Sequence, residues 1–389
     1  MTTIAAAARE VVARHVSAGS VPGAAWAVDV DGETEIGALG KVRVDGDAPV
    51  TPDTVFRISS MTKPITAVAA LCLVDDGVLG LDDPIDRWLP ELADRRVLAP
   101  GATSLDDTVP AARPITVRDV LTFRLGWGMD FTDWSPNPVL EAIFALDIDH
   151  APPTPAPTPP LDEWLRRLGT LPLQRQPGER WLYHLGAEVL GALVARASGQ
   201  PLDAVMAARV LEPLGMADTG FGVPAGALDR FGPCYGRDET GAPTVFDDTD
   251  GQWAARPAFP SGGAGLVSTV GDYLTFARML RAGGVHDGQR ILSAALVDAM
   301  LTNHLTDEQL ATAAPDPTGS QGWGFGLGVQ VRAQPGSPVG SYGWGGGLGS
   351  FWATDPTTGT IGVVLTNQMW SSPQPPAIFT DFARAVFPT

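Results

Sequence analysis

The chain has 389 residues, 44% hydrophobic and 18% charged, a composition typical of a globular protein. This length indicates two domains or one large composite domain. The formal net charge of −18 argues against nucleic acid or an anionic membrane surface as a partner.

The first segment of the chain predicts a helix, because Ile4, Ala8 and Val12 recur at helical spacing. Charges at Arg9 and Glu10 interrupt its apolar run, so the segment does not have the form of a secretory signal. No apolar run reaches the roughly 18 residues that a membrane-spanning helix needs. We therefore expect a cytoplasmic protein without a membrane span.

Asp31-Gly32 lies between two short apolar stretches and predicts a β-hairpin. The segment from Arg57 to Gly77 then predicts an almost wholly apolar helix. Beyond it the composition changes, and Pro-rich loops alternate with helices up to about residue 250. The segment 151–160, "APPTPAPTPP", predicts an extended connector. Three helical patterns follow this connector, at Leu161–Leu168, Ala187–Ser198 and Leu202–Leu211.

Strand signals return after residue 260. The segments 325–331, 349–356 and 358–367 predict strands, and 376–387 predicts a closing helix. The simplest architecture is an α+β fold, in which an antiparallel sheet from both chain ends is flanked by the terminal helices and a mainly helical domain is inserted. This assigns 1–80 and 250–389 to a discontinuous α/β domain and 81–249 to the helical domain.

Metal sites and cofactors are not expected from the sequence. Cys72 and Cys234 are the only two cysteines, and neither lies in a CxxC motif or a Cys/His cluster. The five histidines show no HExxH or other ligand spacing.

The helix start "RISSMTKPI" allows two interpretations. Residues three apart share a helix face, with about 5–6 Å between their Cβ atoms, so Lys63 can reach back to Ser60. A serine hydroxyl becomes a nucleophile when a base lies within hydrogen-bond reach, and a helix N-terminus favours developing negative charge. The alternative is an ordinary helix start, with Ser59 or Ser60 as the N-cap and Lys63 in solvent. A cation in the first turn is unusual, because the helix dipole disfavours it.

Two further features would complete such a site. Tyr183 stands on a loop immediately before a helical pattern and is a candidate for a second proton carrier. The glycine-rich segment 342–352 offers backbone N–H groups for an oxyanion, although its glycines would also let two backbones pass closely. No Gly-x-Ser-x-Gly pentapeptide occurs in the chain, so the α/β-hydrolase nucleophile turn is absent.

Taken together, these segments resemble the serine hydrolases with the class C β-lactamase fold, and most closely the family VIII carboxylesterases. The similarity runs over nearly the whole chain, in the family's order, through 51–85, Ile115–Gly126, 176–202, Leu211–Phe221 and Gly262–Leu280. The resemblance implies a β-lactamase-like fold and strongly favours the catalytic interpretation of the helix start.

Carried over by position, the resemblance makes Ser60 the acylated nucleophile and Lys63 and Tyr183 its proton-transfer partners. The order in which those two act is left open. The third family motif falls on Trp344-Gly345-Gly346, as is typical of the esterase branch. Gly347 would then supply the second oxyanion N–H, beside that of Ser60.

The departures from the lactamase motifs concern the substrate. The asparagine of the Tyr-x-Asn motif is replaced by Leu185, and the cationic or imidazole residue of the third motif is replaced by Trp344. A substrate amide and a carboxylate would each lose a partner, at a cost of about 1–3 kcal/mol apiece. A neutral ester loses neither. These two residues, together with Gly345 and Gly346, are therefore expected to bind an apolar ester.

Aromatic residues in the segment "GWGMDFTDW" are candidates for an acyl pocket. Trp127, Phe131 and Trp134 would line it, and the alternative is that they belong to the core of the helical domain.

His184 follows Tyr183 directly. Because side chains of neighbouring residues point apart, we expect it to be solvent-facing or to support the site from behind.

The sequence thus predicts a serine esterase that hydrolyses small, short-chain, apolar carboxylic esters through an acyl-enzyme on Ser60. A β-lactamase, D-amino-acid peptidase or amide hydrolase of the same fold is the alternative among hydrolases, and acyl transfer to an alcohol also remains open. A non-catalytic binding protein is the alternative of another class, and the complete set of Ser60, Lys63 and Tyr183 argues against it.

Overall fold

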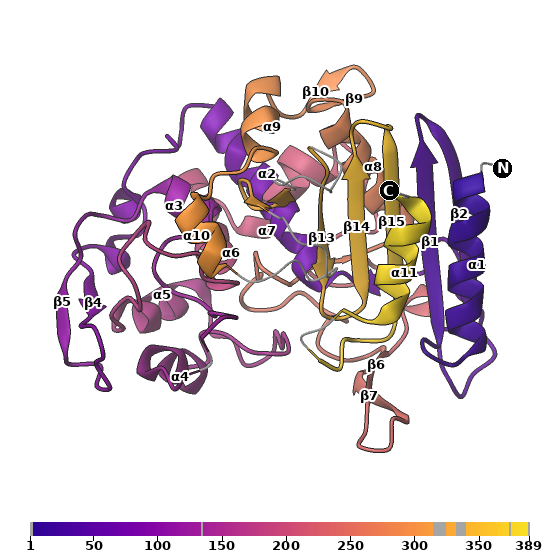
Figure 1. Cartoon of the computed structure of the whole chain (residues 1–389), viewed down its shortest axis with the longest axis horizontal. Helices are drawn as coiled ribbons and strands as arrows, with labels where there is room; N and C mark the ends of the chain where they lie inside the picture. Colours follow the sequence, from indigo (N-terminus) through magenta and orange to yellow (C-terminus); the bar gives the residue numbers. More distant parts are fainter. Residues whose placement is uncertain (1–2, 134, 314–323, 332–339, 373–374, 388–389) are drawn as a thin grey trace.

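The computed structural model describes residues 3–133, 135–313, 324–331, 340–372 and 375–387. Its largest element is a seven-stranded antiparallel sheet in the order β11-β12-β13-β14-β15-β1-β2 (Figure 1). Its strands are β1 (Gly23–Val30), β2 (Glu33–Gly40), β11 (Gly324–Phe325), β12 (Gln330–Val331), β13 (Tyr342–Gly346), β14 (Ser350–Asp355) and β15 (Thr360–Thr366). The sheet joins the N-terminal hairpin to the C-terminal strands, as the sequence predicts.

The described helices are α1 (Thr3–Ser17), α2 (Thr62–Asp75), α3 (Val117–Leu121), α4 (Pro138–Ala145), α5 (Leu161–Gly169), α6 (Leu185–Ser198), α7 (Leu202–Met206), α8 (Val270–Arg281), α9 (Ala294–Met300), α10 (Asp307–Thr312) and α11 (Ala377–Val386). Smaller strand pairs are β3 (Phe56–Arg57) with β8 (Val267–Ser268), β4 (Arg96–Leu98) with β5 (Thr108–Pro110), β6 (Cys234–Arg237) with β7 (Pro243–Asp247), and β9 (Val285–His286) with β10 (Gln289–Arg290). None of these helices combines the length and apolar composition that a membrane span requires.

The two faces of the sheet bury different helices. On β1, Trp26 packs against the terminal helices α1 and α11, whereas the neighbouring Ala25 and Ala27 point into the main core. This alternation follows from the period of two along a strand. Figure 1 shows α1 and α11 beside β1 and β15, and the helices α3 to α7 beyond β13. From the main-core side, α8 packs on β1 and β15. The α+β architecture with flanking terminal helices is therefore confirmed.

The central helix α2 lies inside the main core. Its residues from Thr62 to Leu73 are all buried, in agreement with a sequence that is apolar around the whole helix. It packs against α6 from the middle of the chain. The main core cluster therefore contains residues from both predicted domains, and the division into 1–80 with 250–389 and 81–249 stays a proposal.

Two elements differ in detail from their predictions. The predicted strand 325–331 is divided into β11 and β12, which pair antiparallel across a turn containing Gly328 at φ +76°. A turn with positive φ favours glycine, and Gly328 therefore allows the reversal. The predicted helix Leu202–Leu211 changes after Met206 into a π-helical turn. The hairpin at Asp31-Gly32 is present as predicted, with both residues at positive φ.

Candidate active site

The Ser60 hydroxyl lies at the meeting point of two other polar side chains. Lys63 Nζ donates a hydrogen bond to Ser60 Oγ at 3.1 Å, and the Tyr183 hydroxyl donates to the same oxygen at 2.9 Å. Ser60 is 7% exposed and Lys63 is 1% exposed. The structure therefore brings together the three residues that the sequence singled out, from the start of α2 and the loop before α6.

The local backbone explains how Ser60 is presented. Ser60 lies in a single 3-10 turn, Ser59–Met61, between β3 and α2, and Lys63 follows in the first turn of α2. Ser59 has a φ of +46°, an uncommon conformation for a residue with a side chain. Neither the 3-10 turn nor α2 has a side-chain cap. The alternative of a serine N-cap with a solvated lysine is therefore wrong.

The buried Lys63 side chain has further partners. Its Nζ donates to the Gly263 carbonyl at 2.8 Å and lies 3.0 Å from His184 Nδ1 and 4.7 Å from the centre of the Tyr183 ring. A Cβ atom at position 263 would lie 2.5 Å from a Glu188 carboxylate oxygen, so only glycine fits there without movement of that carboxylate. These contacts fix the direction of the Nζ group toward Ser60.

Tyr183 is held by its backbone and by its neighbours. Its N–H and carbonyl pair with Met129 in an isolated antiparallel bridge, which anchors the loop before α6. Burial by itself raises the pKa of the Tyr183 phenol, but the positive charge at the Lys63–His184 contact and the hydrogen bond with Ser60 outweigh burial and leave the pKa below its usual value. The phenol is thereby favoured as a group that both accepts and donates a proton.

Of the two positions expected for His184, the structure shows the one that supports the site from behind and not the solvent-facing one. The side chain is 5% exposed and meets Lys63, so it does not face solvent or point away from the site. His184 has φ +81° and ψ −65°, and the N–H of Leu185 bonds to the carbonyl of Tyr183 at 3.2 Å. This is a γ-turn of the rare positive-φ kind. It turns two consecutive side chains toward the same lysine.

Two carboxylates surround the other ring nitrogen of His184. Nε2 lies 3.2 Å from Asp149 Oδ1 and 3.2 Å from Glu188 Oε1. This cluster is not predicted from the sequence. Its one local signal is the spacing of four between His184 and Glu188, which places both on one helix face. Nothing local indicates Asp149, which lies just before the extended connector.

Aromatic side chains form a wall beside Tyr183. The Trp344 ring stacks on the Tyr183 ring with centroids 6.0 Å apart. The centroid of the Phe131 ring lies 5.2 Å from that of the Tyr183 ring. Trp127 is fully buried and donates its indole N–H to the Pro172 carbonyl, in agreement with the core alternative. Leu185 is also buried in the main core. Trp134 lies outside the described residues.

The glycine-rich end of β13 packs against the turn that carries Ser60. A Cβ atom at Gly346 would lie 2.3 Å from the Ile58 carbonyl oxygen, whereas one at Gly347 would meet nothing within 4 Å. A Cβ atom at Gly345 would only touch the Trp370 ring, at 3.4 Å. Neither the Ser60 N–H nor the Gly347 N–H donates to another described residue. The glycine sequence is thus needed for a close backbone approach, and it also leaves an N–H group unoccupied.

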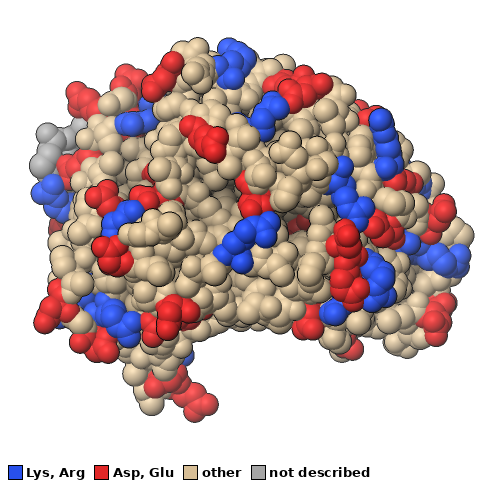
Figure 2. All heavy atoms as spheres, turned by 180° about the vertical axis from the view of Figure 1, so that it is seen from behind, with Lys and Arg blue, Asp and Glu red and all other residues tan. Residues whose placement is uncertain are grey.

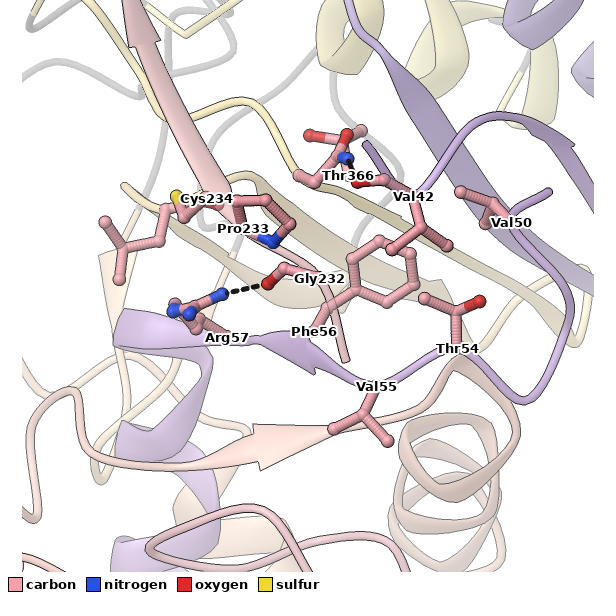
Figure 3. A pocket seen from close by; sticks show the side chains of 12 residues that line it. Val42, Val50, Thr54, Val55, Phe56, Arg57, Gly232, Pro233, Cys234 and Thr366 are labelled. Atoms are coloured by element: carbon pink, nitrogen blue, oxygen red, sulfur yellow. Dashed lines mark hydrogen bonds between the residues drawn. The ribbon is translucent and has the colours of Figure 1, made fainter. Parts of the chain in front are cut away.

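A separate small cavity lies behind β3, lined mainly by apolar side chains and the backbone around Gly232 (Figure 3). Arg57 donates to the Gly232 carbonyl at 2.8 Å and to Asp247 at 2.8 Å. Its guanidinium also lies over the Phe231 ring. These contacts pair the buried Arg57 guanidinium inside the protein and support the strand that leads to Ser60.

No group of three or more His, Cys, Asp or Glu that could hold a metal ion occurs in the described ranges.

Comparisons with known proteins agree with this architecture. A family model described as Beta-lactamase matches residues 8–380. Protein Rv1367c of Mycobacterium tuberculosis (strain ATCC 25618 / H37Rv) is 40% identical over 301 residues, which cover 77% of this chain and 72% of that protein. Esterase EstB of Burkholderia gladioli is 34% identical over 321 residues, with the same 77% and 72% covered. The solved structure of EstCE1, a hydrolase with promiscuous acyltransferase activity, has a TM-score of 0.81 at 26% identity and covers 99% of this chain and 98% of that chain.

The fold and the comparisons define a serine hydrolase of the β-lactamase and penicillin-binding-protein type. This chain belongs to the beta-lactamase family. The resemblance to family VIII carboxylesterases drawn from the sequence segments is thereby confirmed.

Proposed function

We propose that this protein is a carboxylesterase that hydrolyses small, apolar esters through an acyl-enzyme on Ser60. The observation that carries the proposal is the pair of buried donors, Lys63 Nζ and the Tyr183 hydroxyl, on one serine oxygen. A serine becomes a nucleophile when such groups take its proton. The esterase among the relatives supports the same chemistry for this chain.

In the proposed mechanism, Ser60 Oγ attacks the ester carbonyl while its proton passes to the Lys63/Tyr183 pair. The oxyanion forms against the N–H groups of Ser60 and Gly347, a contribution for which removal of one donor typically costs about 10²–10³ in kcat. Tyr183 then returns a proton to the leaving alkoxide, and water hydrolyses the acyl-enzyme. The proton that leaves Ser60 thus ends on the alcohol product.

The surroundings of Ser60 favour an uncharged, apolar substrate. Trp344 stands where the lactamase motif has a cationic or imidazole residue, and it stacks on Tyr183. Phe131 and the Trp344–Phe325 contact extend this apolar wall. We propose that Trp344, Gly345 and Gly346 line the ester site.

Covalent labelling tests the nucleophile. A fluorophosphonate should add its mass once to the wild-type protein, on the peptide that contains Ser60, and Ser60→Ala should remain unlabelled. Ser59→Ala is the matched control, because it removes the neighbouring buried hydroxyl, which has no hydrogen-bond partner among the described residues, and should still be labelled. Absence of labelling in the wild type would favour a non-catalytic binding protein.

A substrate comparison tests the ester assignment. Short p-nitrophenyl esters should be hydrolysed at least 100-fold faster than nitrocefin, as kcat/KM, because a β-lactam carboxylate finds no cationic partner at Trp344. Faster turnover of nitrocefin would contradict the proposal and support a β-lactamase instead. The Ser60→Ala variant sets the background rate for both substrates.

A further inference from the structure

The contact between Lys63 and His184 constrains where one proton lies. Lys63 Nζ and His184 Nδ1 are 3.0 Å apart, and both side chains are at least nine-tenths buried. Two nitrogens at this distance form a hydrogen bond only when one of them lacks a proton on the line between them. Either an ammonium donates to a neutral imidazole, or an imidazolium donates to a neutral amine.

The carboxylates at the opposite ring nitrogen favour the second arrangement. Asp149 and Glu188 are 8% and 4% exposed, and both lie at hydrogen-bond distance from Nε2. Ser261 donates to Glu188 Oε1 at 2.6 Å and fixes that carboxylate. Two buried negative charges beside one ring stabilise its protonated form.

Few other groups act on this cluster. On the α2 side the titratable group is Lys63, and on the loop before α6 it is the Tyr183 phenol. Asp149 comes from the loop after α4, where His150 lines the same small cavity, and Glu188 comes from the first turn of α6. The segment Ser261–Gly265 contributes a hydroxyl and carbonyl groups but no titratable side chain.

We infer that His184 is a positioning residue whose imidazolium, held by Asp149 and Glu188, keeps a proton off the Lys63/Tyr183 pair so that the pair is ready to accept the proton of Ser60. The inference rests on the proposed esterase function. With the shared proton on Nδ1, the Lys63/Tyr183 pair can take up one further proton. As Oγ bonds to the carbonyl carbon, the Ser60 proton moves to this pair, and it later leaves with the alkoxide. His184 keeps its own proton throughout.

The titration of His184 agrees with this arrangement. Burial lowers the pKa of the imidazole, and positive charge at Lys63 lowers it further, but the charge of Asp149 and the hydrogen bonds to Asp149 and Glu188 outweigh both and raise the pKa to about 9. The ring is thus positively charged at neutral pH. The rare γ-turn at His184 costs about 1–3 kcal/mol, a strain that fits a residue positioned for function.

The pH dependence of kcat/KM for a p-nitrophenyl ester tests the inference. His184→Asn removes the positive charge and leaves two carboxylates behind Lys63, and asparagine tolerates positive φ better than most residues. We expect the acidic limb to move to higher pH by about one unit, which is a tenfold loss at a fixed pH on that limb. Adding Glu188→Gln to the His184→Asn variant restores the net charge of the cluster. It should move the acidic limb back toward its position in the wild type.

His150→Asn is the matched control, because it removes the neighbouring imidazole and should leave the limb in place. An equal loss at every pH in His184→Asn, without recovery in the double variant, would overturn the inference and leave a purely structural role. An inactive or unlabelled wild type would instead overturn the esterase proposal, so the two failures are distinguishable.

A measurement on the wild type does not depend on the variants folding. In ¹⁵N-histidine-labelled protein, one imidazole should keep both N–H groups through pH 8, and its signal should move when a phosphonate occupies Ser60. Loss of the second proton by pH 8 in every imidazole that responds to the phosphonate would overturn the inference.

Discussion

At the residue scale, the Ser60 oxygen is held by donors of two kinds. Lys63 brings a buried amine and Tyr183 brings a phenol whose pKa lies below its usual value, since the positive charge at the Lys63–His184 contact outweighs its burial. A single hydroxyl separates tyrosine from phenylalanine, so the phenol can be tested with little change in packing.

Tyr183→Phe removes the hydroxyl but keeps the ring stacked against Trp344. We expect kcat for a p-nitrophenyl ester to fall by about 10²–10⁴-fold, because general acid–base catalysis contributes this much. Steady-state kinetics measure the change. Tyr235→Phe is the control, since its hydroxyl contacts the Val44 N–H and should leave kcat within about twofold. A Tyr183→Phe variant with more than a tenth of the wild-type kcat would contradict the assigned role.

At the element scale, the turn that carries Ser60 is fixed from both sides. β13 approaches it through Gly346, and Ser350 on β14 donates to the Ile58 carbonyl at 2.7 Å. On the preceding side, β3 is anchored by the buried ion pair between Arg57 and Asp247, each with a side chain 3% exposed. These contacts extend from the nucleophile into elements that are distant in sequence.

Asp247→Asn should destabilise the protein, because it leaves the buried Arg57 charge without its partner. Breaking one member of such a pair typically costs about 3–5 kcal/mol. The free energy of unfolding in urea measures the loss. Asp248→Asn, whose carboxylate bonds Arg43 at the surface, is the control and should change that free energy by at most about 1 kcal/mol. Equal losses in the two variants would argue against the special role of the buried pair.

At the scale of the whole molecule, basic and acidic groups are interspersed. On the face in Figure 2, most Lys and Arg side chains lie beside Asp or Glu, and no broad basic area is visible. Inside, Asp29 on β1 is fully buried and pairs with Arg278 and Arg281, which ties α8 to the sheet. The expectation of a small-molecule rather than a nucleic-acid partner stays a prediction.

The stability of the protein should decline on the alkaline side of neutrality. The folded state raises the pKa of His184 from 6.5 to about 9, because Asp149 and Glu188 outweigh burial. A raised pKa contributes stability fully below pH 6.5, and this contribution is lost as pH rises to about 9. The loss is on the order of 3 kcal/mol.

Urea unfolding at pH 6.5 and 9 measures this decline in the free energy of unfolding. His184→Asn lacks the titrating group and should show a smaller difference between the two pH values. The same difference in both proteins would place the pH dependence elsewhere in the molecule. His286→Asn, at a partly exposed position in the β9–β10 hairpin, is the control and should behave as the wild type.

Elements that depend on neighbours along the chain were predictable. The hairpin at Asp31-Gly32, the buried α2 and the alternation in β1 follow from local periodicity and turn chemistry. The split between β11 and β12 was not predicted, since a short apolar run does not reveal a reversal at Gly328. Trp127 shows the same limit, because an aromatic residue in a loop fits a core and a pocket equally well until its neighbours are known.

The sequence by itself determined that Ser60 and Lys63 share a helix face, because a spacing of three residues has that consequence in any helix. It also determined the family, because segments along nearly the whole chain match in order. Only the tertiary structure decided that Tyr183 reaches Ser60, that a positive φ turns His184 onto Lys63, and that Asp149 completes the cluster. These contacts join residues far apart in sequence, or depend on a strained backbone that packing alone maintains.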